Sequence, residues 1–273
     1  LQKVFNRLAY AFLALDGHLT WGRTARVATG GTNNASFKVY VPPVQAVVLF
    51  DGSNWDVYSS NAETELTSSN SFASGTLAND TTYYVYGKIS GGALAFEVST
   101  TVPDTARTWK TSTVGTHRYL FWFHTSSAGV PLPMQMRGGL YLYRYSAITS
   151  TELRALNTTS TAGSPVDMIL ARGGTGGREL LPPHMRAAFV RSELTVVGNH
   201  ANDKATAYYV STGDTTGNTV QHDVYAPTTI RNERDFWIEC DGDRKIQYSL
   251  LFSNSDAGDP TATLNVFVLG GQE

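Results

Sequence analysis

The chain has 273 residues, a formal net charge of −2 at pH 7 and a pI near 6.3, with 16% charged and 41% apolar residues. This length predicts one or two domains with a substantial hydrophobic core. The near-neutral balance provides no basic surface, so we expect neither nucleic-acid binding nor membrane insertion. The sequence holds one cysteine, Cys240, which cannot form an intrachain disulfide and argues against a zinc site.

Residues 1–20 differ from the rest of the chain and predict a short amphipathic helix. Val4, Leu8, Ala11 and Leu15 lie at helical spacing and form one apolar face. A helix this short is marginal alone in water, so its face needs either the body of the protein or further copies of itself. Both alternatives stay open. In the second, the helix is a stem or an anchor, and these four residues are candidate oligomer contacts.

From Trp21 onward the apolar period changes to two, which predicts strands. Short apolar runs recur about every ten residues with Gly or Pro between them, so we interpret residues 21–147 as a first β module. Within this module, residues 59–80 are mainly small and polar, and they predict a long surface loop.

The last 126 or so residues divide into a connecting segment and a second β module. Capping-box spacing predicts a turn or two of helix over residues 150–156, and the Gly- and Thr-rich remainder of residues 148–178 predicts a linker. Residues 179–273 again carry strand patterns. The predicted fold class is therefore all-β, with two β-sandwich or barrel-like modules preceded by a short N-terminal amphipathic helix.

The catalytic templates that can be recognised in a sequence fail here. There is no Gly-x-Ser-x-Gly elbow, no His-Glu-x-x-His and no Gly-x-x-x-x-Gly-Lys loop. The six histidines are dispersed, and turn formation explains the close carboxylate pairs. These pairs are Glu63 with Glu65, Asp241 with Asp243, and Asp256 with Asp259. We predict no catalytic residue, no metal site and no cofactor.

Aromatic residues occupy both faces of several predicted strands, as in the run Phe121-Trp122-Phe123. One face must be core, and the other is open to three interpretations: sugar stacking, subunit contact, or a strand packed on both sides. For sugar stacking, the candidates are Trp55, Tyr58 and Trp122. The chain has 15 Arg and 6 Lys, which favours subunit contact because Arg forms planar forks and stacks on rings.

The segment from Asn79 to Tyr145 resembles modules of tailed-bacteriophage fibre and related virion proteins. Such modules have a hairpin that ends in a Val-Ser-Thr…Pro edge, followed by an Arg-Tyr-Leu…Gly-x-x-Pro hairpin. The matching pieces are Tyr83-Tyr-Val-Tyr86, Leu94-Ala-Phe-Glu-Val-Ser-Thr100 with Pro103, His117-Arg-Tyr-Leu-Phe121, Thr125-Ser-Ser-Ala-Gly129 and Gln135-Met-Arg-Gly-Gly139-Leu-Tyr-Leu-Tyr143. With Leu19-Thr-Trp21 and Gly52-Ser-Asn-Trp55 upstream, the similarity covers residues 19–145.

The resemblance implies a non-enzymatic structural protein of a tailed-phage particle, in a tail fibre, baseplate, neck or head fibre. Such a protein is usually a homotrimer, and we expect its N-terminal region to contact other virion proteins. Its β modules would face outward, where several weak contacts in host attachment act together. The alternative is a module that binds a host glycan or receptor through exposed aromatics. A third hypothesis, a polysaccharide-cleaving enzyme, requires an acid pair in a groove.

Overall fold

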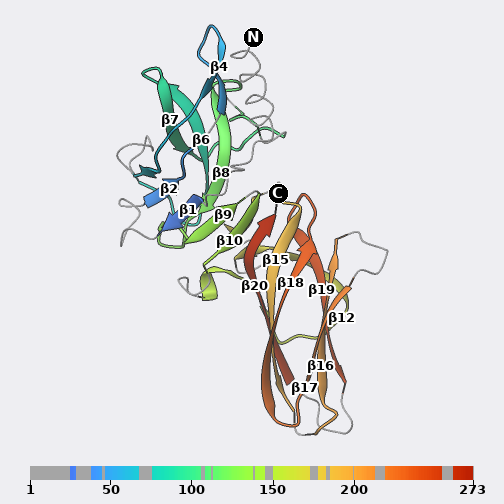
Figure 1. The fold of residues 1–273 in the computed structure, drawn as a ribbon. Coiled ribbons are helices and arrows are strands. Elements are labelled where there is room, and N and C mark those ends of the chain that lie inside the picture. Colours follow the sequence, from blue (N-terminus) through green and yellow to red (C-terminus); the bar gives the residue numbers. More distant parts are fainter. Residues whose placement is uncertain are drawn as a thin grey trace. The chain divides into compact units, whose positions relative to one another are not determined.

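The computed structural model shows two compact units, Leu1–Arg144 and Tyr145–Glu273 (Figure 1). It describes residues 25–28, 38–44, 47–67, 76–105, 108–111, 113–137, 139–144, 150–172, 178–182, 185–198, 200–212, 219–253 and 261–272. The predicted helix of residues 1–20, with Val4, Leu8, Ala11 and Leu15, lies outside the described residues. The division between the units falls close to the predicted end of the first module at residue 147.

The described strands of the first unit are short and pair antiparallel. They are β1 (Ala25–Ala28), β2 (Lys38–Val41), β3 (Val47–Phe50), β4 (Trp55–Tyr58), β5 (Thr64–Leu66), β6 (Thr82–Ser90), β7 (Ala93–Ser99), β8 (His117–His124), β9 (Met134–Arg137) and β10 (Leu140–Tyr143). One set runs in the order β10-β9-β1-β2-β5, another in the order β7-β6-β8, and β3 and β4 form a hairpin.

Strands β6 and β8 form the aromatic core of the first unit. Most side chains of both strands are buried on both faces of the sheet. Tyr83 stacks on Phe123 with ring centres 5.5 Å apart, and Trp122 stacks on Tyr141 at 5.2 Å. For these two strands, aromatic residues on both faces therefore reflect a strand packed on both sides.

The prediction of one long loop over residues 59–80 is wrong in part, because β5 lies within it. Leu66 pairs with Val39 of β2, and both side chains are buried, as is Leu77. A three-residue edge strand needs only one buried side chain. It therefore leaves almost no periodic signal in a polar segment.

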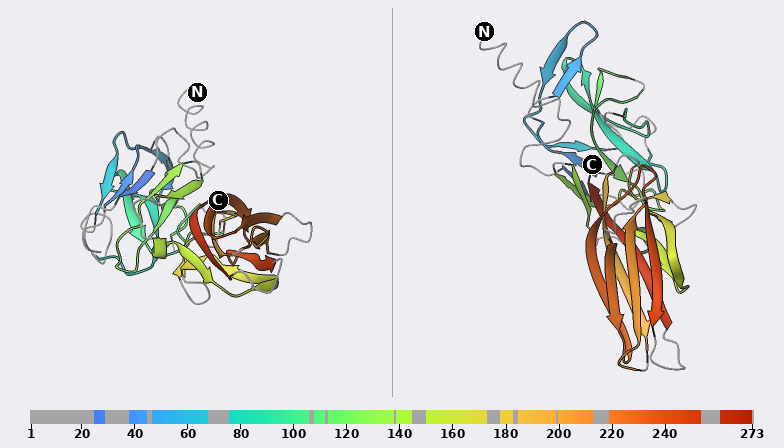
Figure 2. Two further views of the ribbon diagram at one scale, coloured as in Figure 1. Left: turned by 90° about the horizontal axis from the view of Figure 1, so that it is seen from below. Right: turned by 90° about the vertical axis from the view of Figure 1, so that its right-hand side faces the viewer.

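The second unit consists of two facing antiparallel sheets. Its described strands are β11 (Arg154–Thr158), β12 (Ala162–Ile169), β13 (Ala171–Arg172), β14 (Arg178–Glu179), β15 (Ala187–Val197), β16 (Lys204–Ser211), β17 (Thr219–Tyr225), β18 (Thr229–Glu239), β19 (Lys245–Ser253) and β20 (Thr261–Gln272). One sheet has the order β18-β15-β20-β11 and the other β12-β19-β16-β17, while β13 pairs with β14. Figure 2 shows these long strands, yellow to red, lying along one another.

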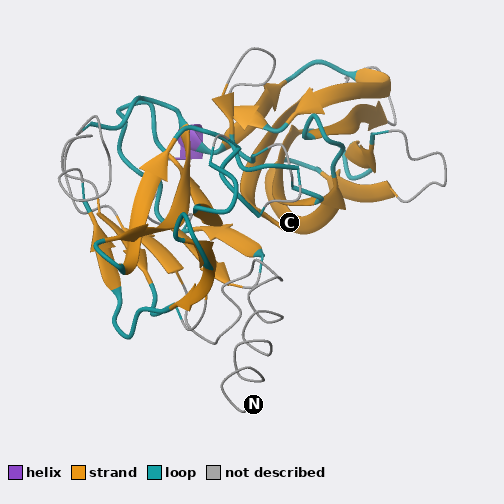
Figure 3. Ribbon diagram, turned by 90° about the horizontal axis from the view of Figure 1, so that it is seen from above, coloured by secondary structure: helices purple, strands orange, loops and turns teal. Residues whose placement is uncertain are grey.

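The all-β fold class is confirmed. Strands dominate both units (Figure 3), and the described residues contain one short 3₁₀ helix, Ser150–Glu152. The predicted helix over residues 150–156 is wrong beyond that turn, because β11 begins at Arg154 with Leu153 and Ala155 fully buried. The predicted linker is also wrong where it covers β11 and β12, since these strands pair with β20 and β19.

Replacing Leu66 with Ala tests β5. The side chain is 2% exposed, and we expect the free energy of unfolding to fall by about 2–5 kcal/mol, measured by urea denaturation. Ala62→Ser, at an exposed position of the same segment, should change it by less than about 0.5 kcal/mol. Equal, small effects of the two substitutions would show that residue 66 lies in a solvated loop.

Candidate functional site

The structure does not bring the three predicted sugar-stacking residues together. Trp55 is 56% exposed at the start of β4. Tyr58 is half-buried and, three positions along the same strand, lies on the opposite face. Trp122 is 0% exposed, so its selection as a stacking residue is wrong: a ring enclosed in the core offers no face to a ligand. An isolated apolar run could not reveal which of its residues the unit encloses.

The close carboxylates that the structure describes serve turns and ion pairs. An Asp241 carboxylate oxygen accepts hydrogen bonds from the backbone N–H groups of Asp243 and Lys245, at 3.0 and 2.7 Å. Glu65 lies 2.9 Å from the Lys38 ammonium. Asp256 and Asp259 lie outside the described residues. In the described ranges, no three His, Cys, Asp or Glu side chains are grouped to hold a metal ion, and no helix has the length and apolarity to cross a membrane.

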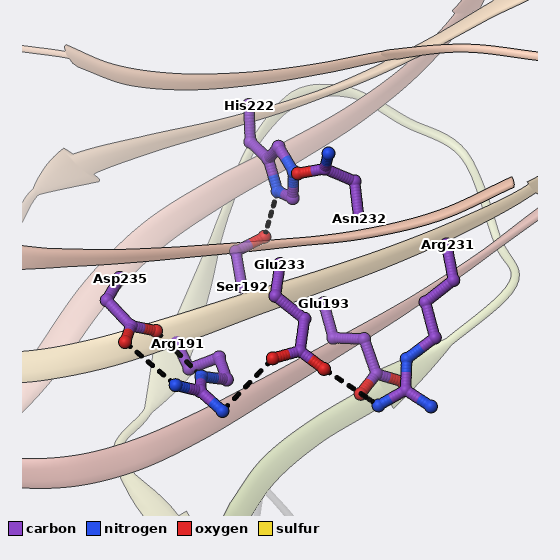
Figure 4. Close-up of polar contacts among 8 residues, drawn as sticks. All are labelled: Arg191, Ser192, Glu193, His222, Arg231, Asn232, Glu233 and Asp235. Carbon is purple, nitrogen blue, oxygen red and sulfur yellow. Dashed lines mark hydrogen bonds and ion pairs between the residues drawn. The ribbon is translucent and has the colours of Figure 1, made fainter.

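In the described part of the second unit, a chain of hydrogen bonds runs through four strands, and we call it the polar core chain; Figure 4 draws its members Ser192, His222 and Asn232. The Tyr209 hydroxyl of β16 donates to Ser192 Oγ of β15 at 2.6 Å. Ser192 Oγ lies 2.8 Å from Nδ1 of His222 on β17. His222 Nε2 lies 3.0 Å from Asn232 Oδ1 on β18. All three of these contacts cross from one sheet to the other.

Strand alternation places Ser192 in the core. Every second residue of β15 points between the sheets, and the others at these positions are fully buried apolar side chains: Ala188, Val190, Leu194 and Val196. Ser192 is 0% exposed and His222 is 3% exposed, so water cannot satisfy their polar atoms. The sequence analysis missed Ser192. The signal for it was a single hydroxyl residue among alternate positions of β15 that are otherwise apolar.

The partners determine how the protons are arranged. The Asn232 carboxamide oxygen can only accept, so His222 carries its proton on Nε2. Nδ1 of the neutral ring then accepts from the Ser192 hydroxyl, whose oxygen in turn accepts from Tyr209. Each of the three donor protons along the chain has an acceptor, and this agreement requires a neutral imidazole.

Burial lowers the pKa of His222, and the positive charge of Arg234 lowers it further, while Asn232 and Asp223 act in the opposite direction. A second proton on the ring would occupy Nδ1. The hydroxyl proton of Ser192 would then lose its acceptor inside the core. The polar core chain therefore favours the neutral ring both by desolvation and by geometry.

Serine, histidine and asparagine in hydrogen-bonded order resemble a catalytic triad, but the arrangement lacks what a nucleophile needs. In serine hydrolases Nε2 of the histidine faces the serine, whereas here it is Nδ1. Tyr209 donates to Ser192 Oγ, and the side chain is fully enclosed. This geometry supports a fastening role between the two sheets.

On the opposite, outer face of β15 and β18, charged side chains form a second set, which we call the charged ladder (Figure 4). Its members are Arg191, Glu193, Arg231, Glu233 and Asp235. Glu193 lies directly opposite Glu233 in the strand register, a repulsive pairing. Arg231 bridges these two carboxylates at 2.5 and 2.9 Å, and Arg191 joins Glu233 to Asp235 at 3.0 and 2.7 Å. The two arginines thus give each of the three adjacent carboxylates a cationic partner.

The first unit has its own half-buried ion cluster around Glu97 of β7. The Lys110 and Lys88 ammonium groups lie 2.6 and 2.8 Å from its two oxygens, and His117 Nε2 lies 3.3 Å away. Burial opposes ionisation of Glu97, but the hydrogen bonds and charges of the two lysines outweigh it and lower its pKa to about 2. The cluster fastens the segment that carries Lys110 to the sheet of β6, β7 and β8.

Replacing Ser192 with Ala should destabilise the second unit. Tyr209 and His222 Nδ1 would lose their common partner inside a closed core, which should lower the free energy of unfolding by about 1–3 kcal/mol in urea denaturation. Ser253→Ala, at an exposed position of β19, is the matched control and should change it by less than about 0.5 kcal/mol. If the two variants behave alike, the polar core chain does not fasten the sheets.

Acid should weaken the second unit through His222. Its pKa in the folded state is below the ordinary 6.5, so the unfolded state binds more protons as the pH falls past that value. Its contribution is complete above about pH 6.5 and is lost on acidification, with a slope of at most about 1.4 kcal/mol per pH unit. Denaturation at a series of pH values should give a shallower slope for His222→Gln than for the wild type. Parallel slopes for wild type and His222→Gln would contradict this assignment.

Comparison with known proteins yields little about function. No protein-family model matches the chain, and no curated protein sequence matches it. Among solved structures, a chain of the T13 particle of infectious bursal disease virus shares 14% identity, with 90% of this chain and 69% of that chain covered and a TM-score of 0.22. The T=1 particle derived from the same virus shares 14% identity, with 91% of this chain and 72% of that chain covered and a TM-score of 0.20. For the Gx strain of the virus the identity is 11%, the coverages are 90% and 72%, and the TM-score is 0.21. Scores at this level lie below those of proteins that share a fold, so they carry no argument about this chain.

Proposed function

We propose that this protein is a non-enzymatic structural component of a tailed-bacteriophage particle, in its tail or capsid. In this proposal three copies associate through the N-terminal region, which also contacts other virion proteins. The β units are displayed outward, where weak contacts repeated in three copies reinforce one another in host attachment.

The observation that carries the proposal is the resemblance of residues 19–145 to phage fibre modules, together with the way the matching pieces fold. The first two pieces form the hairpin of β6 and β7, which turns at Gly91 and Gly92 with positive φ angles. The third piece lies in β8, which pairs with β6. Thr125 and Pro131 form a bridge around the turn that follows. The first three pieces thus form one three-stranded sheet, and the last piece forms the β9–β10 pair of the neighbouring strand set.

The chemistry of the second unit agrees with a non-enzymatic role. The polar core chain uses its serine and histidine to join two sheets, and the charged ladder pairs its carboxylates with arginine at short distances. These groups stabilise the fold in their present arrangement.

A second candidate function, glycan binding in host attachment, is favoured by one observation. Trp55 presents more than half of its surface to solvent, unlike the aromatic residues of β6 and β8. Host attachment by a phage protein and glycan binding are compatible, since one particle component can do both.

The trimer is tested by size-exclusion chromatography with light scattering on the full chain. We expect a mass of about 89 kDa, three times the chain mass of 29.7 kDa. Leu8→Asp should lower this mass while leaving the β units folded, because a charge would be buried in the seam between helices. Asn6→Asp places the same charge on the opposite side of the predicted helix and should leave the mass unchanged.

A monomer at micromolar concentration would contradict the proposed trimer. A trimer that survives Leu8→Asp would show that association takes place through the β units and that the N-terminal region is not responsible. Circular dichroism of each variant provides the control for folding.

A further inference from the structure

One corner of the first unit exposes apolar surface. Among the residues described in this unit, the large apolar side chains that are exposed are Trp55, Val102 and Val114. Val114 immediately precedes Gly115, which lies against the Trp55 indole. We call Trp55, Trp109 and Val114 the tryptophan corner. An exposed indole offers a flat apolar surface, and a ligand gains most from it where the ring is held in a fixed position.

The exposed indole is held in a fixed position. The Trp55 ring centre lies 5.4 Å from that of Phe50 and 5.7 Å from that of Trp109, with tilts of 43° and 58°. Trp109 is fixed in turn, because the buried Arg118 guanidinium lies 5.1 Å from its ring centre. The backbone N–H and C=O of Trp109 are both hydrogen-bonded to Asp104. The aromatic surface is therefore preorganised, which reduces the entropy lost on binding.

Gly115 is required beneath the ring. Its φ of +87° disfavours any side chain, and a Cβ there would lie 3.1 Å from the Trp55 indole. Its carbonyl accepts a hydrogen bond of 2.8 Å from the Phe50 N–H, which fixes the β3–β4 hairpin to this segment. The Trp55 ring is thus held by the Gly115 backbone and by its contacts with two other rings. One of those rings, Trp109, is itself held by Arg118.

Polar groups lie next to the exposed ring. The turn that leads into Trp55 consists of Asp51, Gly52, Ser53 and Asn54, all exposed. Asp51 accepts the N–H groups of Ser53 and Asn54 at 2.7 Å each, and these bonds lower its pKa, which keeps it an anion at neutral pH. A flat apolar surface bordered by hydroxyl, amide and carboxylate groups suits a ligand with one C–H face and a rim of hydroxyl groups.

Size decides between a sugar and a protein partner. A stable protein interface buries about 1,200–2,000 Å² in total, whereas one aromatic side chain supplies about 150–250 Å². One half-exposed indole with the adjacent Val114 falls far short of an interface, but it has about the dimensions of one sugar ring. We propose that the tryptophan corner binds a pyranose ring of a neutral carbohydrate, with the C–H face on Trp55 and the hydroxyl groups toward the Asp51–Asn54 turn. This inference does not depend on the phage assignment.

The test is a titration of the full chain with cellohexaose, maltohexaose and the β-1,4-linked hexamer of N-acetylglucosamine, followed by tryptophan fluorescence and saturation-transfer NMR. We expect at least one of the three to bind, and Trp55→Ala to weaken that binding by about tenfold or more. Trp55→Phe should restore most of the affinity. Trp237→Ala removes another exposed, ring-stacked tryptophan, in the second unit, and should change the affinity by less than about twofold.

The absence of binding by all three hexasaccharides, or binding that survives Trp55→Ala in a folded variant, would overturn the proposal. A change in oligomer mass caused by Trp55→Ala, without sugar binding to the wild type, would identify the corner as a contact between copies and would also overturn it. Because the trimer is measured separately with Leu8→Asp, failure here leaves the proposed virion role intact.

Discussion

The second unit depends on one requirement: polar atoms enclosed between two sheets must find their hydrogen-bond partners there. Ser192 lies in a row of fully buried apolar side chains, and its hydroxyl is satisfied only because Tyr209 and His222 reach it from the facing sheet. Apolar contacts tolerate small shifts of one sheet over the other, whereas hydrogen bonds of fixed direction do not. The polar core chain therefore specifies the alignment of the sheets as well as contributing stability.

The two units solve the problem of buried polarity differently. The first holds a half-buried ionised carboxylate, Glu97, and stabilises it with two lysines. The second joins its sheets through the neutral side chains of the polar core chain and pairs the carboxylates of the charged ladder with arginine. The polar core chain becomes less stable as the pH falls past the ordinary pKa of histidine, because His222 is buried as the neutral ring. Glu97 stays ionised until the pH approaches its pKa of about 2. Mild acid therefore acts on the second unit through His222 and leaves Glu97 ionised.

Periodicity in the sequence was sufficient for the all-β class and for the strands with clean alternation, such as β2 and β17. Periodicity did not identify strands that carry many charged residues or that are only a few residues long. Strand β18 carries Arg231, Glu233 and Asp235 on its outer face, so its first half had no apolar signal. The polar core chain joins residues 10 to 30 positions apart, and only the pairing of β15 with β18 and β16 with β17 brings them together. The exposure of individual aromatic residues could not be predicted either. Trp55 and Trp122 both lie in short apolar runs, yet Trp55 is at the surface and Trp122 is in the core.

In the described residues, buried and paired polar groups join the β sheets, and the tryptophan corner faces solvent. The central claim, that the protein is a part of a phage particle, is tested most directly by imaging the particles of the virus that encodes it. Electron cryomicroscopy, with mass spectrometry of the purified particles, should find the chain in them, with three copies of the two β units around a common axis at the tail or capsid. Purified particles that lack the chain, while infected cells contain it, would contradict the account.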